Sequence, residues 1–202
     1  MSSILSGTTP LFEDTNEDGG LDIIGRQKSF NFFVFEGDGN DIVTGGLKFD
    51  RIEGGDGDDF ISGLQGDDQL IGGDGDDTLI GGDDEDLLDG GADDDLLIGG
   101  DGDDLLIGDA GVDIMTGGAG NDIFEFSAES LISGEIDKIN DFSEGDEFED
   151  LIRLKGIGRD AVVEYNSETG AISVNGEDFI QLDSGLDITV DNEDGDDTWE
   201  LF

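Results

Sequence analysis

A nine-residue period runs through the middle of this chain and restricts its possible folds more than any other feature. Residues 36–125 divide into ten consecutive units of nine residues, without an insertion or a deletion. The most regular unit, residues 72–80, reads Gly-Gly-Asp-Gly-Asp-Asp-Thr-Leu-Ile. All ten units have an aspartate at the sixth place and an apolar residue at the eighth. The sixth-place residues are Asp41, Asp50, Asp59, Asp68, Asp77, Asp86, Asp95, Asp104, Asp113 and Asp122.

The chemistry of one unit predicts an all-β stack of coils. Six polar and glycine residues form a turn, and three residues with an apolar centre form a short strand whose middle side chain points inward. Two units then close one coil. Stacked coils place each turn over the turn two units away, at a spacing of about 4.8 Å. The sixth-place aspartates therefore form two columns. The eighth-place residues that form the core are Val43, Ile52, Ile61, Leu70, Leu79, Leu88, Leu97, Leu106, Met115 and Phe124.

The two columns bring like charges together. At an effective dielectric constant near 20, neighbouring carboxylates at this spacing repel each other by about 3 to 4 kcal/mol. Within the turns, Lys48 is the one lysine that could offset the repulsion. A divalent cation between successive turns reverses the sign, and carboxylates with glycine-rich backbone carbonyls suit calcium best. The chain has no Cys and no His, so zinc, copper and iron–sulfur sites lack their usual ligands.

These units resemble the calcium-binding nonapeptide repeats of RTX proteins. The resemblance covers residues 36–125. It implies a right-handed parallel β-roll in which each calcium ion lies between turns one coil apart. The implied ligands are the sixth-place aspartates and turn carbonyls. Besides the ten aspartates, the candidate site residues are the turn glycines Gly54, Gly72, Gly75, Gly99, Gly102, Gly117 and Gly120.

Some units depart from the RTX pattern. The replacements are Glu36 at the first place, Leu64 and Asp109 at the second, and Lys48, Asp84 and Asp93 at the fourth. The fourth place favours glycine because a positive φ is expected there. The turns at residues 45–50 and 81–86, which carry Lys48 and Asp84, are therefore predicted to form the poorer calcium sites.

Residues 1–35 are predicted to form an N-terminal cap. A cluster of phenylalanines ends this segment: Phe30, Phe32, Phe33 and Phe35. Such a cluster can cover the open end of a stack, whose terminal units require capping. Residues 14–22 resemble the start of an EF-hand calcium loop, but Gly25 takes the twelfth place, where a bidentate glutamate is needed. This stretch is either a weak calcium loop or a solvated acidic turn.

Residues 126–202 are predicted to form a C-terminal β cap. Residues 136–146 resemble the flank that follows the last repeat in RTX proteins. Apolar or alternating runs at 161–165, 171–174 and 178–182, separated by turn residues, predict a β-meander. Residues 191–202 end in Thr-Trp-Glu-Leu-Phe. This ending resembles an uncleaved signal for type I export, and the alternative is a plain final strand.

The seventh and ninth places of each unit face outward, and from Ile71 onward they are rich in aliphatic residues. These are Ile80, Leu87, Leu96, Ile98, Leu105, Ile107, Ile114 and Ile123. Exposed aliphatic surface of this extent usually marks a contact. Either the C-terminal segment or a second copy of the chain covers it, or it docks another protein.

Charge and composition narrow the function further. The formal charge is −47 in 202 residues, and nucleic acid and anionic membranes repel such a field. Leu, Ile, Val and Phe make up about 29% of the chain, above the roughly 20% below which a core is implausible. The fold is therefore expected to depend on bound cation. The first ten residues lack the pattern of a Sec signal peptide, and no membrane span is predicted.

No catalytic arrangement is recognisable, because histidine is absent and the repeated carboxylates are accounted for as metal ligands. The favoured interpretation is a secreted calcium-binding RTX repeat protein with a structural or surface-associated role, exported by type I machinery. The alternative is a noncatalytic carbohydrate-associated module of a polysaccharide-modifying system. One Trp, one Tyr and eight basic residues support that alternative only weakly. No regular Thr or Asn ladder favours ice binding.

Overall fold

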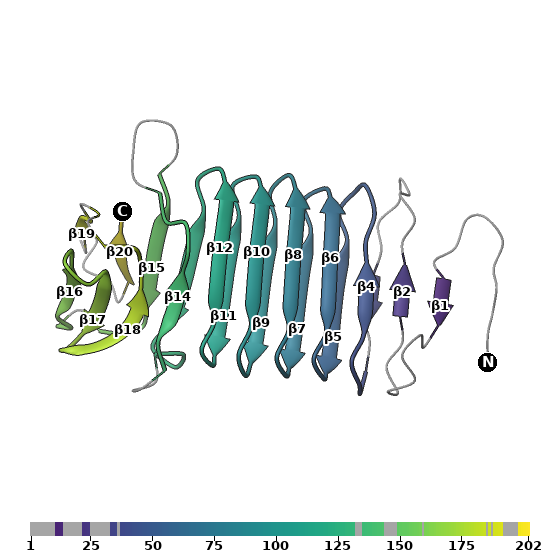
Figure 1. Cartoon of the computed structure of the whole chain (residues 1–202), viewed down its shortest axis with the longest axis horizontal. Coiled ribbons are helices and arrows are strands. Elements are labelled where there is room, and N and C mark those ends of the chain that lie inside the picture. Colours follow the sequence, from purple (N-terminus) through teal and green to yellow (C-terminus); the bar gives the residue numbers. More distant parts are fainter. Residues whose placement is uncertain are drawn as a thin grey trace.

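The computed structural model describes residues 37–131, 135–143, 149–158, 160–184, 186, 188–191 and 198–202, with the backbone of residues 11–13, 22–24 and 33–35. The repeats form two parallel sheets, one on each side of a shared core (Figure 1). The first sheet contains β4 (Ile42–Thr44), β6 (Phe60–Gln65), β8 (Thr78–Asp83), β10 (Leu96–Asp101) and β12 (Ile114–Ala119). The second contains β5 (Arg51–Asp56), β7 (Gln69–Asp74), β9 (Leu87–Ala92), β11 (Leu105–Ala110) and β13 (Ile123–Ser127).

The register of both sheets follows the sequence period. Consecutive strands alternate between the sheets, and neighbours within one sheet pair in parallel two units apart. Leu70 pairs with Leu88 in the second sheet, and Leu79 pairs with Leu97 in the first. One coil is therefore two repeats, and the predicted all-β roll is confirmed.

The eighth-place residues form the core between the sheets. Val43 is 1% exposed, and the other nine, from Ile52 to Phe124, are 0% exposed. Burying such a side chain stabilises the fold by about 1.5 to 3 kcal/mol relative to leaving it in water. The seventh and ninth residues of the same strands are partly exposed, so strand alternation selects one apolar row per strand.

At the C-terminal end, both sheets continue past the repeats. β14 (Asp137–Ile139) pairs in parallel with β12, and β15 (Leu151–Lys155) pairs in parallel with β13. Phe142 packs against Phe124, with ring centroids 6.3 Å apart. The flank that resembles the RTX post-repeat segment therefore lies directly on the last layer of the core.

The predicted meander is confirmed. β16 (Val163–Asn166), β17 (Ala171–Val174) and β18 (Glu177–Gln181) form antiparallel pairs, and β18 joins β14 in parallel. β20 (Thr198–Leu201) pairs antiparallel with β15 and with β19 (Val190–Asp191). Leu201 is fully buried, and the Trp199 indole N–H donates to the Gly158 carbonyl oxygen at 3.2 Å. The chain thus ends in a paired strand.

At the N-terminal end, parallel stacking begins before residue 36. β3 (Phe33–Phe35) pairs with β5, and β2 (Asp22–Ile24) pairs with β4. β1 (Leu11–Glu13) pairs antiparallel with β2. Residues 14–21 of the EF-hand-like stretch, together with Phe30 and Phe32, lie outside the described residues.

The outward face of the first sheet is not covered by the described C-terminal elements. β14 to β20 extend the two sheets at one end of the roll instead of folding back over β4 to β12 (Figure 1). Phe60 and Ile114 are 42% and 41% exposed. In the described part of the chain, no helix is long and apolar enough to cross a membrane.

Candidate calcium sites

The sixth-place aspartates lie in two buried columns, one along each edge of the roll. Their exposed fractions are 0 to 4%. The backbone N–H of each aspartate donates to Oδ1 of the aspartate one coil onward. Asp50 donates to Asp68 at 2.7 Å, and Asp95 donates to Asp113 at 3.0 Å. The same bond joins every successive pair from Asp41 to Asp113 and from Asp50 to Asp122.

Two aspartates beyond the repeats extend these columns. The Asp113 N–H donates to Asp137 Oδ1 at 2.9 Å, and the Asp122 N–H donates to Asp150 Oδ1 at 3.0 Å. Both acceptors are buried. Sequence analysis missed them because the steps are 24 and 28 residues instead of 18. The available signal was that each precedes a buried isoleucine by two residues, as the sixth place precedes the eighth.

The second carboxylate oxygen of most column residues has no hydrogen-bond partner. These buried Oδ2 atoms belong to Asp68, Asp77, Asp86, Asp95, Asp104, Asp113 and Asp122. Leaving such an atom unsatisfied costs about 1 to 3 kcal/mol, and more when it is charged. The columns therefore present a series of inward-facing acceptors that require a positively charged ligand or a proton.

The unpartnered oxygens lie against the first-place glycines. A Cβ added to Gly72 would overlap Asp77 Oδ2 and would lie 2.5 Å from the Gly90 carbonyl oxygen, one coil onward. Gly54 and Gly99 have the same surroundings, and at Gly117 the overlap is with Asp122 Oδ2. A carboxylate oxygen and a carbonyl oxygen thus approach the same glycine. This is a hard oxygen donor set, which fits calcium.

Each site has few carboxylates. Among the described residues, no group of three or more acidic side chains is placed to hold one ion. A calcium ion with six to eight oxygen ligands must then take most of them from backbone carbonyls and water. This agrees with the turn carbonyls that the RTX resemblance implies.

Burial changes the titration of the columns. Loss of hydration, together with the repulsion of neighbouring carboxylates, raises the pKa of Asp77 from 3.8 to about 7 and that of Asp86 to about 8. Backbone hydrogen bonds lower the pKa and oppose the shift only in part. Asp137, beyond the repeats, also has its pKa raised to about 7. Without a cation, the column carboxyl groups with a pKa near 7 or 8 are therefore partly protonated at neutral pH.

The replacements of the fourth-place glycine change the conformation of their turns to different extents. The fourth-place Gly75, Gly102 and Gly120 have φ values of 128°, 153° and 143°. Asp84 keeps this type of turn at φ 78°, at a cost of about 1 to 2 kcal/mol for a residue with a Cβ. The turn that contains it leaves Asp86 Oδ2 unpartnered, as the regular turns do.

The turn at residues 45–50 is built differently. Lys48 is not among the described residues with positive φ. Instead, the Gly46 N–H donates to Asp50 Oδ2 at 2.7 Å. The oxygen that faces the adjacent glycine in other units therefore already accepts a backbone hydrogen bond.

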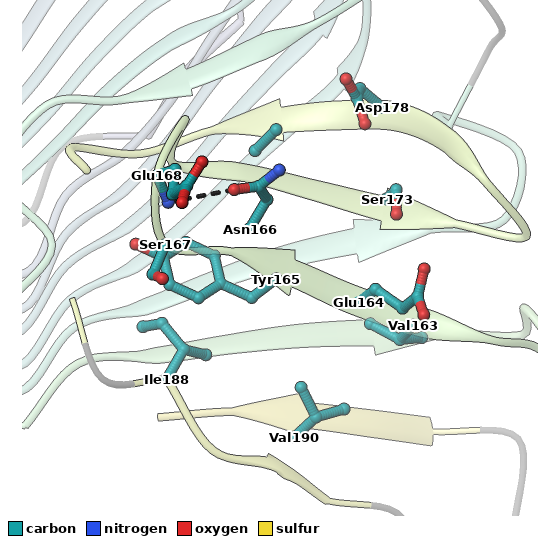
Figure 2. A pocket seen from close by; sticks show the side chains of 11 residues that line it. Val163, Glu164, Tyr165, Asn166, Ser167, Glu168, Ser173, Asp178, Ile188 and Val190 are labelled. Carbon is teal, nitrogen blue, oxygen red and sulfur yellow. Dashed lines mark hydrogen bonds between the residues drawn. The ribbon is translucent and has the colours of Figure 1, made fainter. Parts of the chain in front are cut away.

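A separate cavity lies on the C-terminal cap, over β16 and β17 and beside Ile188 and Val190 (Figure 2). Its volume is about 720 Å³, and Glu164, Asp178 and Tyr165 are among its lining residues. The Tyr165 hydroxyl donates to the Asp183 carbonyl oxygen at 3.2 Å. This cavity is acidic and has one aromatic side chain.

Comparison with known proteins identifies the repeats. The family described as the RTX calcium-binding nonapeptide repeat (4 copies) matches residues 37–70, 62–97 and 89–124. A search of curated proteins found no match. The matched segments end one residue before the period stops, so they do not include Asp137 or Asp150.

Proposed function

Because residues 37–124 consist of RTX calcium-binding nonapeptide repeats, we propose that this protein binds several calcium ions between its coils and folds as it binds them. The observation that carries the proposal is the series of buried Oδ2 atoms without a hydrogen-bond partner. Such atoms destabilise a cation-free roll, whereas a bound divalent cation turns each of them into a ligand. Calcium when bound supplies charge neutralisation and crosslinks successive coils.

The proposed ligands come from two places in the repeat, and a third place shapes the turn. Oδ2 of a sixth-place aspartate provides one oxygen, and the first-place glycine one coil onward provides a carbonyl oxygen beside it, as at Asp77 and Gly90. The fourth-place glycines, such as Gly75, hold the turn in a positive-φ conformation that residues with a Cβ rarely adopt. Asp50 is the weakest member, because Gly46 already donates to its second oxygen.

Calcium removal tests the coupling of binding and folding. We expect the chelated protein to lose its β circular dichroism signal and to expand, and calcium to restore both with a midpoint near 10⁻⁴ to 10⁻³ M, as for other extracellular calcium modules. Size-exclusion chromatography and circular dichroism are measured in parallel, with magnesium as the control ion. A compact β protein in chelator at low salt would falsify the proposal.

Comparison of two column residues tests the ligand assignment. Asp77→Ala should raise the calcium midpoint more than Asp50→Ala, since only Asp77 offers a second oxygen that has no partner. Each variant also removes a buried acceptor of a backbone N–H, that of Asp59 for Asp77→Ala and that of Gly46 for Asp50→Ala. Equal midpoints would mean that the unpartnered oxygen is not a ligand.

We further propose that the protein is exported by type I machinery and acts outside the cell in a structural or surface-associated role. The support is the RTX resemblance and the ending Trp199-Glu-Leu-Phe202. A deletion of residues 191–202 should leave calcium-dependent folding largely intact but retain the protein inside the cell. Because Leu201 is buried against β15, folding of the deletion must be measured beside its secretion. Normal secretion would remove the main support for type I export.

A further inference from the structure

One groove on the roll is lined in part by column aspartates and in part by residues that the proposed calcium sites do not use. It runs along the outside of the column that contains Asp68, Asp86 and Asp104, with a volume of about 520 Å³. One wall is formed by seventh-place residues, the apolar Leu87, Leu105 and Ile123 with Gln69 at one end of the row. The other wall is formed by fifth-place residues, the acidic Asp67, Glu85 and Asp103 together with Phe49.

The apolar wall has a regular spacing. Leu87 pairs with Leu105, and Leu105 pairs with Ile123, in adjacent parallel strands β9, β11 and β13. Their side chains are partly exposed. They therefore form a row with one side chain every 4.7 to 4.9 Å, the separation of neighbouring strands.

The acidic wall differs from the same place on the opposite edge of the roll. There, Asp58 Oδ1 accepts the Asp76 N–H, and Asp76 Oδ1 accepts the Asp94 N–H, at 3.2 and 3.1 Å. In the groove, Asp103 Oδ1 also accepts a backbone N–H, from Asn121 at 2.8 Å. Among the described residues, however, the side chains of Asp67 and Glu85 accept no hydrogen bond and form no ion pair, and both are exposed. The carboxylates of Asp67 and Glu85 are therefore available to a partner.

We propose that this groove docks an amphipathic α-helix of a partner protein, with its apolar stripe on Leu87, Leu105 and Ile123 and a row of lysines or arginines on Asp67 and Glu85. Charge complementarity selects a basic partner, because the chain carries a net charge of −47. A second copy of this chain would bring acidic edges together and is disfavoured on the same ground.

The spacing of the groove selects a helix over an extended peptide. Successive side chains on one helix face recur about every 5.4 Å, and on one strand face about every 6.6 to 6.8 Å. Over the two coil steps from Leu87 to Ile123, the apolar row advances roughly 10 Å. Two helical steps span about 11 Å, whereas two strand steps span about 13 Å. The spacing of the apolar row therefore matches a helix more closely than a strand.

The test uses three synthetic peptides of identical composition and the folded full chain in calcium. The first has leucines at helical spacing with lysines along one flank, the second alternates leucine and lysine with a period of two, and the third is scrambled. Binding is measured by fluorescence anisotropy at two salt concentrations. We expect the helical peptide to bind at least tenfold more tightly than the other two.

Matched variants locate the binding site. Leu87→Glu should weaken binding of the helical peptide at least tenfold, whereas Leu96→Glu, at the same place on the opposite sheet, should not.

The acidic wall is tested in the same way. Asp67→Asn with Glu85→Gln should weaken binding, whereas Asp56→Asn with Asp74→Asn, at the far ends of strands β5 and β7 in the same sheet, should not. Circular dichroism in calcium confirms that each variant is folded. In a second measurement, the charge reversal Glu85→Lys should be rescued by a peptide with one lysine changed to glutamate.

Three results would overturn the proposal. The first is equal binding of the scrambled peptide, which would mean non-specific attraction to the acidic chain. The second is an equal loss in Leu96→Glu. The third is self-association in sedimentation experiments that Leu87→Glu abolishes, which would assign the groove to a second copy. None of these results bears on calcium binding, because every measurement is made on the folded, calcium-loaded chain.

Discussion

Two parts of the molecule form the same ladder of hydrogen bonds, each from an aspartate N–H to Oδ1 of the next column aspartate, from different sequences. Within the repeats, each N–H reaches an aspartate 18 residues onward, as from Asp95 to Asp113. At the C-terminal end, the ladder reaches Asp137 after 24 residues and Asp150 after 28. The geometry is unchanged although the period is lost. The ladder therefore depends on an aspartate two residues before a buried apolar residue, and the length of the connection is secondary.

The end of the ladder also differs in how its oxygens are satisfied. Asp122 Oδ2 has no partner, whereas Asp150 Oδ2 accepts the Ser143 N–H at 2.7 Å. Both oxygens of Asp141 accept N–H groups, from Gly117 at 3.0 Å and Gly118 at 2.9 Å. The C-terminal carboxylates at this edge are therefore saturated by backbone donors. They terminate a column that the repeats leave open to cations.

Removing the non-periodic part should have the largest effect. A deletion of residues 127–202 takes away the acceptors of the Asp113 and Asp122 N–H groups and exposes the buried Phe124 layer. It also leaves unpaired strand edges at the end of the stack. We expect calcium to induce little stable β structure in this deletion, as measured by circular dichroism and hydrogen exchange. Folding with the parent calcium midpoint would show that the repeats need no closing carboxylates.

Aspartates in both parts of the ladder should titrate in the same pH range. In the roll, burial raises the pKa of Asp77 from 3.8 to about 7, and at the end it raises that of Asp137 equally. A carboxyl group whose pKa is higher in the folded state binds more protons when folded. Its stabilising contribution is complete below about pH 3.8 and is lost as the pH rises through about 7.

Without calcium, the chain should therefore gain β structure as the pH falls from 8 to 4. With calcium, the half-saturating concentration should fall as the pH rises from 6 to 8, since protons compete for the same oxygens. Circular dichroism with calcium titration at each pH measures both trends. Asp77→Asn, which removes one titrating group, should flatten them slightly. A conformation that is independent of pH in chelator would show that the columns do not titrate near neutrality.

Two single substitutions test whether the hydrogen bond beyond the repeats contributes as much to stability as one within them. Asp137→Ala and Asp95→Ala each remove the acceptor of one buried N–H, from Asp113 and Asp77 respectively. We expect each to destabilise the calcium-loaded protein by about 1 to 3 kcal/mol, as measured by urea unfolding at saturating calcium. Glu164→Ala, on the cap meander and away from the ladder, is the control. A negligible effect of Asp137→Ala would restrict the ladder to the repeats.

Much of the fold could be read from the repeat itself. The period, the sixth-place aspartates and the eighth-place core residues determine both sheets and both columns, because strand alternation admits one inward row. The meander was recognisable from its apolar runs and turns. Asp137 and Asp150 were not, since no period connects them to the roll. The turn around Lys48 was predicted to form a poorer calcium site. The hydrogen bond from the Gly46 N–H to Asp50 that distinguishes this turn could not be predicted, because it depends on backbone geometry.

The smallest expected effect concerns a turn that keeps the period but departs from the residue pattern. Leu64 occupies the second place with φ 85°, a conformation that its neighbours in the stack, such as Gly82 at φ 134°, adopt without a Cβ. A left-handed conformation costs a residue with a Cβ about 1 to 2 kcal/mol. Leu64→Gly removes this strain but increases the freedom of the unfolded chain and loses a partly exposed side chain. We therefore expect the free energy of unfolding, measured with urea at saturating calcium, to rise by at most about 1 kcal/mol.

Gln65→Gly is the control. It lies at the next position and has no positive φ, so it should instead destabilise the protein by roughly 0.5 to 1 kcal/mol. If both substitutions destabilise it equally, the repeat tolerates a positive φ at the second place at no cost, and the turn glycines are retained for close approach of the coils alone.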